Sequence, residues 1–185
     1  LRPQDLALLN ELLMQCQFDP AVKVVFLTGD TAAFCAGADL KAVNAAARDR
    51  GIEGSELASE VLQRIVTMSK IVIAAVSGPA SGLGHHIATV CDLAVIRAGA
   101  SFHYTGPEKG IPSLQLGALV LPMMIGVKRA KELLIRGGVL SAERAVELGL
   151  ANAVVPAAEW DAHLDALAAE FTARHPQVMA LDKYQ

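Results

Sequence analysis

The fold is decided by one stretch, IVIAAVSGPASGLGHHIATV at residues 71–90. Its apolar, largely β-branched beginning predicts a buried strand at residues 71–78, and the glycines that follow predict a turn opening onto a helix. Such a turn leaves backbone N–H groups free at the start of the helix, where the helix dipole favours negative charge. The same glycines would also be explained by a tight turn with no further role.

A second unit of this kind lies upstream. Residues 22–29, VKVVFLTG, predict a buried strand, and residues 30–43, DTAAFCAGADLKAV, predict a loop that turns into a helix near Asp39. The Asp39 carboxylate is suited to capping the free amides there. Two such units side by side would present one N–H from each loop to a single oxygen. That arrangement is an oxyanion hole, suited to an enolate formed from a thioester or to a tetrahedral intermediate.

The rest of the chain predicts a third strand at residues 93–98, a short apolar–polar alternation at residues 100–104, and then helices only. Strands separated by helices imply parallel crossovers, with functional loops at the carboxyl ends of the strands, so we expect an α/β fold. The polar stretch at 48–56 is expected to be a mobile loop. Helices are expected at about 3–17, 56–70, 114–125, 127–136, 141–149 and 156–174.

Composition excludes several classes of protein. The 185 residues suit one domain with a substantial core, and no apolar run approaches the roughly 20 residues of a membrane span. A net charge of −3 provides no basic field for nucleic acid. The three cysteines have no metal-ligand spacing and favour reduced thiols, so we expect a cytoplasmic location. The chain begins without Met inside one helical pattern and stops inside another, so we expect it to be trimmed at both ends.

Four separated motifs carry a resemblance to a known family: FCAGADL at 34–40, IVIAAVSGPASGLG at 71–84, CDLAVI at 91–96 and SAERAVELGLANAVV at 141–155. In order and spacing they resemble the enoyl-CoA hydratase/isomerase, or crotonase, family over nearly the whole chain. The resemblance implies one crotonase-like domain over residues 1–185, an α/β spiral of β–β–α units (the ClpP/crotonase fold) with a helical C-terminal part. It also implies a lyase of fatty acid metabolism that acts on acyl-coenzyme A, assembled as a homotrimer or a dimer of trimers.

The resemblance also implies roles for residues of the two glycine loops. The oxyanion hole would be formed by the backbone N–H groups of Ala38 and Leu83, although the family usually has glycine at the latter position. Coenzyme A would enter as part of the substrate, with no tightly bound cofactor and no metal. The residues expected to bind the substrate and its coenzyme A are Ala36, Gly37, Ala38, Asp39, Leu40, Lys41 and Gly82.

The acid–base residues depart from the pattern of the family. Its hydratases use two glutamates, but an ungapped match puts His86 at the first position, and Glu108 reaches the second only if its loop is bulged. We expect a neutral His86, near a helix N-terminus, to act as general base or donor with Glu108 as its partner. A core histidine and a solvated Glu108–Lys109 ion pair are the structural alternatives. Adjacent helical residues point about 100° apart, so His85 is expected to pack elsewhere.

Several other polar or sulfur-containing residues have expected positions in the fold. His103 and Tyr104 alternate on a short strand, so one of them should face the site. Asp92 is expected to receive backbone donors at a strand entry. Three methionines are expected to lie in the core or the acyl pocket: Met68, Met123 and Met124.

Several other functions stay open or are set aside. A decarboxylase or a carbon–carbon hydrolase of the same family would reuse the oxyanion hole with a histidine. A catalytically silent homologue would bind acyl-CoA only. The adjacent histidines do not have zinc-ligand spacing, GPASGLG lacks the dinucleotide pattern, and Ser81 is not in a nucleophile elbow.

Overall fold

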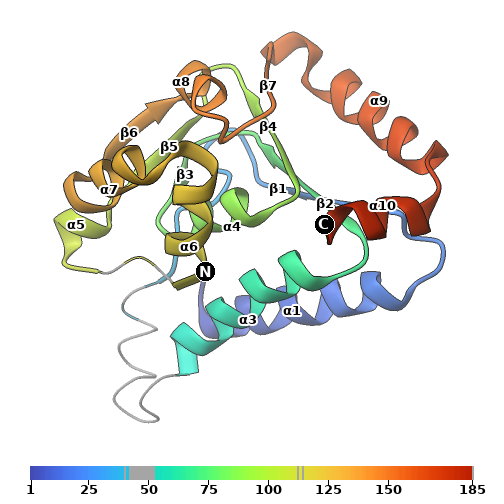
Figure 1. Cartoon of the computed structure of the whole chain (residues 1–185), viewed down its shortest axis with the longest axis horizontal. Coiled ribbons are helices and arrows are strands. Elements are labelled where there is room, and N and C mark those ends of the chain that lie inside the picture. The colour runs from blue at the N-terminus through green and yellow to red at the C-terminus, as the bar shows by residue number, and fades with distance from the viewer. Residues whose placement is uncertain (40, 42–52, 112, 114, 185) are drawn as a thin grey trace.

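The computed structural model describes residues 1–39, 41, 53–111, 113 and 115–184 (Figure 1). The expected mobile loop at 48–56 therefore lies largely outside the described residues. The described strands are β1 (Val24–Thr28), β2 (Ile71–Val76), β3 (Ala80–Ser81), β4 (Leu93–Arg97), β5 (Ser101–Tyr104), β6 (Gly138–Ser141) and β7 (Ala153–Val155). The described helices are α1 (Pro3–Phe18), α3 (Glu53–Thr67), α4 (Leu83–Val90), α5 (Gly106–Lys109), α6 (Gln115–Ile125), α7 (Val127–Arg136), α8 (Ala142–Glu147), the 3₁₀ turn η1 (Ala157–Glu159), α9 (Trp160–Ala173) and α10 (Pro176–Lys183).

The main sheet is parallel and follows the order β1-β2-β4-β7. Its centre is β2, whose six residues are all buried, as expected of a strand covered on both faces. The strands predicted at 22–29, 71–78 and 93–98 are confirmed. The expectation of helices alone after the third strand is wrong, since β6 and β7 follow it. β7 has only three residues, too few to show a strand period, and it is held by its pairing with β4.

A second, smaller sheet has the order β3-β5-β6 and lies at the carboxyl end of the main strands. The chain passes from β2 into β3 and then into α4, and from β4 into β5 and then into α5. This is the repeated β–β–α spiral that the resemblance to the family implies. Because β3 pairs in parallel with β5, the turn after β2 is held against the strand that carries His103.

Helices cover both faces of the main sheet. α1 and α3 lie side by side below it, and α9 lies on the other side near β7 (Figure 1). The larger core contains the fully buried Leu6 and Leu13 of α1, and a smaller one joins Trp160 of α9 to the other face of the sheet. Within the described residues, no helix has the length and apolarity that crossing a membrane requires.

The C-terminal helix is tied to the sheet through one carboxylate. Asp92 accepts the Val72 N–H at 2.7 Å and the Lys183 ammonium at 2.8 Å, which confirms its predicted role at a strand entry. Burial raises the pKa of Asp92, whereas the hydrogen bonds from Lys183 and Val72 act in the opposite direction. The Lys183 ammonium also donates to the carbonyls of Ile65 and Lys70, so it serves three acceptors in a nearly buried place.

We expect Lys183→Met to lower the free energy of unfolding by about 3–5 kcal/mol, because it leaves a partly buried carboxylate and two carbonyls without their donor. Urea denaturation followed by circular dichroism measures the loss. Asp182→Asn, an exposed change on the same helix, should stay within about 0.5 kcal/mol of the parent. A loss below about 1 kcal/mol for Lys183→Met would contradict the role of this ammonium.

Candidate active site

The two glycine loops lie against each other through their main chains. The Phe34 N–H donates to the Pro79 carbonyl at 3.0 Å, and the Ser81 N–H donates to the Cys35 carbonyl at 2.8 Å. Cys35 and Ala80 form an isolated parallel β-bridge between the loops. The loop after β1 and the turn after β2 are therefore joined as if they were two short strands.

Gly37 lies where the loops come closest. It has a φ of +97°, and a Cβ on it would lie 2.9 Å from the Ser81 carbonyl oxygen and 3.5 Å from the Leu83 nitrogen. Only glycine combines this backbone conformation with such close approach. Gly82, with a φ of +53°, faces Gly37 across the contact. Since Leu83 is the first residue of α4, its N–H belongs to the first-turn donors that have no partner within the helix.

The other residues predicted to bind coenzyme A extend outward from this contact. Ala36 and Asp39 are exposed, and Ala38 is half-buried. The Asp39 carboxylate accepts the Lys41 N–H at 3.0 Å, and Lys41 is exposed, but the helix that Asp39 is predicted to cap lies largely outside the described residues. Leu40 lies outside the described residues.

The two histidines lie on a helix that is buried along its whole length. The ring centroids of His85 and His86 are 4.0 Å apart, and His85 also lies 4.0 Å from the ring of Tyr104 on β5. His86 instead faces α6, where its Nδ1 would be 2.0 Å from a Cβ on Gly117. As expected, the neighbours face different elements, but they also contact each other because no solvent separates them.

Burial determines the charge of both imidazoles. It lowers the pKa of His86 to about 4, and burial together with the neighbouring His86 holds the pKa of His85 well below its usual value. The backbone of His103 acts in the opposite direction and raises the pKa of His85, but it forms no hydrogen bond with the His85 ring. Both ring nitrogens of His85 are buried without a hydrogen-bonding partner. Both rings are therefore neutral at pH 7.

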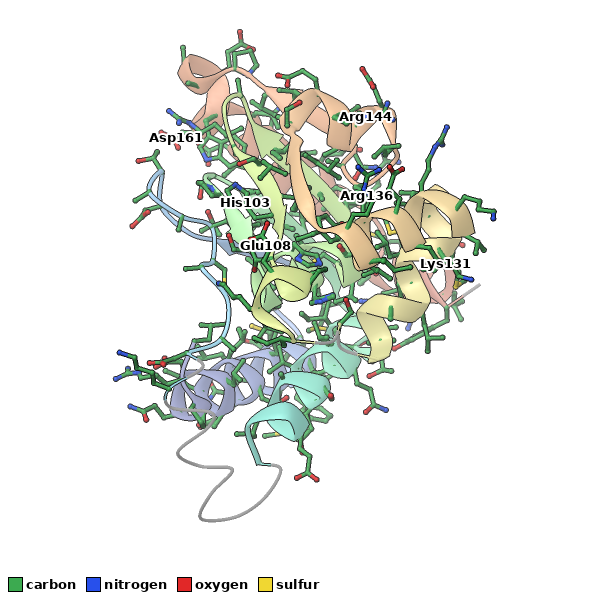
Figure 2. The ribbon with its side chains drawn as sticks, turned by 90° about the vertical axis from the view of Figure 1, so that its left-hand side faces the viewer. His103, Glu108, Lys131, Arg136, Arg144 and Asp161 are labelled. Carbon is green, nitrogen blue, oxygen red and sulfur yellow. The ribbon has the colours of Figure 1, made fainter. Side chains whose placement is uncertain are left out.

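Glu108 lies in a different environment from His86. It is exposed on α5, directly after β5, where Figure 2 shows it together with His103. Within the described residues, no hydrogen bond or ion pair joins Glu108 to His86. On β5, Tyr104 is buried, whereas the half-buried His103 forms a hydrogen bond with the Ser101 hydroxyl at 2.9 Å, so the two alternate as predicted.

The methionines separate into core and surface. Met68 is buried, as predicted, but Met123 is 84% exposed and Met124 is also exposed, so these two are not part of the core that the described residues form. The reason is that α6 turns this face outward. Among the described residues, no three His, Cys, Asp or Glu side chains are grouped to hold a metal ion.

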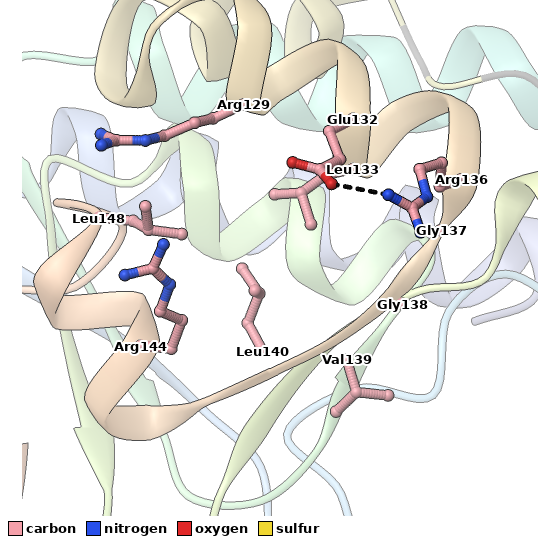
Figure 3. A pocket seen from close by; sticks show the side chains of 10 residues that line it. All are labelled: Arg129, Glu132, Leu133, Arg136, Gly137, Gly138, Val139, Leu140, Arg144 and Leu148. Carbon is pink, nitrogen blue, oxygen red and sulfur yellow. Dashed lines mark hydrogen bonds and ion pairs between the residues drawn. The ribbon is translucent and has the colours of Figure 1, made fainter.

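A separate pocket of about 390 Å³ lies between α7, β6 and α8 (Figure 3). Three arginines line it, Arg129, Arg136 and Arg144, and Arg136 donates to Glu132 at 2.9 Å. None of the residues predicted for the site lines this pocket. Its lining residues all lie in the consecutive elements α7, β6 and α8 or directly next to them, and this segment was not predicted as a site from the sequence.

Comparisons with known proteins agree with this architecture. Residues 2–184 match the family model described as Enoyl-CoA hydratase/isomerase. A probable enoyl-CoA hydratase of Mycobacterium bovis is 35% identical over 80% of this chain and 55% of its own length. The 4-chlorobenzoyl coenzyme A dehalogenase-1 of an Arthrobacter species is 30% identical over 94% of this chain and 64% of its own length. The chain thus spans between half and two thirds of these curated relatives.

A solved structure shows the same fold. The crystal structure of enoyl-CoA hydratase from Bacillus anthracis superposes with a TM-score of 0.90 at 31% identity, covering 97% of this chain and 70% of that one. The spiral of β–β–α units predicted from the sequence is therefore the fold of this chain.

The burial of His86 predicts a dependence of stability on pH. The unfolded chain has a histidine pKa near 6.5 and the folded one about 4, so between these values the unfolded state binds more protons. The contribution of His86 to the free energy of unfolding is therefore complete above pH 6.5 and is lost as the pH falls toward 4. The loss amounts to about 3 kcal/mol for this residue. His86→Gln should remove that part of the slope in urea titrations, whereas His175→Gln, at an exposed position, should not. Equal slopes for the His86 variant and the parent would contradict the burial argument.

Proposed function

Because the chain belongs to the enoyl-CoA hydratase/isomerase family, we propose that it processes an acyl-CoA thioester by stabilising the enolate formed on it. The observation that carries the proposal is the main-chain contact between the two turns, in which Gly37 lies against Ser81 and Leu83. That contact brings the start of α4 beside the peptide that follows Gly37. Negative charge developing on a thioester oxygen would be stabilised there by N–H groups and by the helix dipole.

The proposed oxyanion hole consists of the N–H groups of Ala38 and Leu83. A single donor of this kind contributes about 3–4 kcal/mol to transition-state stabilisation in enzymes where one has been removed. Because both donors are main-chain groups, the leucine in place of the glycine usual in the family does not remove a donor. Gly82 permits the turn that aims the second N–H.

Coenzyme A would lie along the first loop. From the buried Gly37 the loop passes through the half-buried Ala38 to the exposed Asp39 and Lys41, which suits a ligand with a buried thioester and an exposed nucleotide. Lys41 is placed at the exposed end, where an ammonium would approach a phosphate. Coenzyme A is here part of the substrate, and the proposal includes no tightly bound cofactor.

The nominal reaction is hydration or isomerisation of an enoyl-CoA, with His86 and Glu108 as the acid–base pair. In hydration, a base takes a proton from water as its oxygen bonds to the β carbon, and the enolate then takes a proton at the α carbon. Burial keeps the imidazole of His86 neutral at pH 7, so its unprotonated nitrogen is free to accept a proton, although the lowered pKa makes it a weaker base than an exposed histidine. Glu108 is exposed on the short α5, so its participation requires that the substrate or a movement of this segment bring it closer.

A second candidate reaction follows from the histidine itself. With an imidazole where the family's hydratases have a carboxylate, the same oxyanion hole would serve a decarboxylation or a hydrolytic carbon–carbon cleavage. The similarity to a dehalogenase supports this candidate, because that relative is named for a different reaction of a coenzyme A thioester. A silent homologue would instead bind acyl-CoA without turnover.

The three free thiols are the basis for a proposed cytoplasmic location.

We expect His86→Ala and Glu108→Gln each to lower kcat for an enoyl-CoA by about 10²–10⁴-fold, the range for loss of a general acid or base. Loss of the conjugated thioester absorbance of crotonyl-CoA measures hydration. His175→Gln and Glu132→Gln, exposed changes away from the turns, serve as controls and should retain activity. If the parent binds acyl-CoA but turns over none of the thioesters tested, the silent homologue is correct.

The proposed assembly is a homotrimer or a dimer of trimers. Apolar side chains are strongly exposed along α6 and α7, with Leu119 at 67% and Met123 at 84%. Exposed apolar surface of this kind is typical of an interface. The separate helices expected at residues 114–125 and 127–136 are confirmed, and their exposed apolar residues are what a subunit contact would bury.

We expect Met123→Lys and Leu119→Lys to shift the chain toward monomer, because a charge at the centre of an apolar contact opposes its burial. Sedimentation velocity at several protein concentrations measures the change. Glu159→Lys, at an exposed site far along the chain, is the control. A parent that sediments as a monomer at every concentration would overturn the proposed assembly.

A further inference from the structure

Gly117 of α6 lies directly against the ring of His86. A Cβ built on Gly117 would be 2.0 Å from His86 Nδ1, 2.8 Å from Cε1 and 3.0 Å from Cγ. All three distances are at or below the limit that real Cβ contacts reach. The ring therefore occupies the space that the side chain of any residue other than glycine would need at position 117. Gly117 thus forms a notch that accommodates the His86 ring.

The His86 ring also has a ring as a neighbour. His85 lies 4.0 Å from His86 between ring centroids and itself lies 4.0 Å from Tyr104. These three side chains are buried, so they form a row from β5 to α6 that ends in the notch. A buried ring held between a row of rings and a backbone has little freedom to rotate.

We propose that Gly117 is a positioning residue, whose missing side chain seats the His86 ring against α6 and sets which of its nitrogens faces the substrate. The inference rests on the proposed function, in which His86 acts on the acyl-CoA. The Nδ1 edge is turned toward Gly117, so the opposite edge, with Nε2, is the one left for proton transfer. Glycine is a poor helix former compared with alanine, and the notch accounts for its presence within α6.

The test compares Gly117→Ala with Ala118→Gly, which removes one Cβ from the next residue of the same helix. We expect the methyl group of Gly117→Ala to displace the His86 ring, shift its ring NMR signals and change its titration. Turnover of the acyl-CoA should fall by about 100-fold in kcat with a smaller change in KM, as for a group displaced by about 1 Å. Ala118→Gly should leave the His86 signals and turnover unchanged.

A second background separates the notch from general damage to α6. In a His86→Ala chain the notch is empty, so adding Gly117→Ala should raise the midpoint of thermal unfolding rather than lower it, because alanine favours the helix. If Gly117→Ala alone fails to fold, the double variant should still fold. An equal loss of stability in both backgrounds, or unshifted His86 signals in Gly117→Ala, overturns the inference.

The readouts also distinguish this inference from the proposed function. Full turnover by His86→Ala would refute the catalytic role of His86 and with it the claim that the notch serves catalysis. The NMR signals and the comparison of backgrounds test the seating of the ring by themselves, whichever reaction the chain performs.

Discussion

Main-chain contact between two turns is the constraint on which the rest of the structure depends. The loop after β1 and the turn after β2 are joined by hydrogen bonds between backbone atoms, and a Cβ on Gly84 would lie 2.4 Å from the Cys35 carbonyl oxygen. Because the neighbour is backbone, it cannot give way as a flexible side chain would. The start of α4 is thereby pressed against the first loop, and this contact determines both the position of Leu83 and the burial of the histidines that follow it.

Complete burial of α4 then determines its chemistry. Burying two imidazoles in one helix carries an energetic cost, because the ring nitrogens of His85 leave water without gaining partners. The same burial keeps both rings neutral at pH 7, so each has an unprotonated nitrogen, and it lowers their strength as bases. Sequences that only needed a stable core would place apolar residues here. We interpret the histidines as the part of the core that serves the site.

Local patterns predicted the parts of the fold that are long or periodic. The central strands and most helices lie where the apolar runs placed them, since a buried strand must be apolar throughout and a surface helix must repeat every 3.6 residues. The strands β3, β6 and β7 were not predicted, because two to four residues are too few to show a period and each is held by a partner distant in the chain. The exposure of Met123 was not predicted, because the sequence pattern of an apolar helix face is the same whether that face packs against the core or against another subunit.

What the sequence by itself determined was the order of strand, glycine turn and helix, the residue types in the two turns, and the family that these motifs resemble. Those features are local, because the conformational preference of each residue depends mainly on its own backbone and side chain. Only the tertiary structure decided which surfaces meet: Gly37 against Leu83, His86 against Gly117, and Lys183 against Asp92. Each of these contacts joins residues separated by at least thirty positions, and their distance in space follows from strand pairing and helix packing rather than from any local preference.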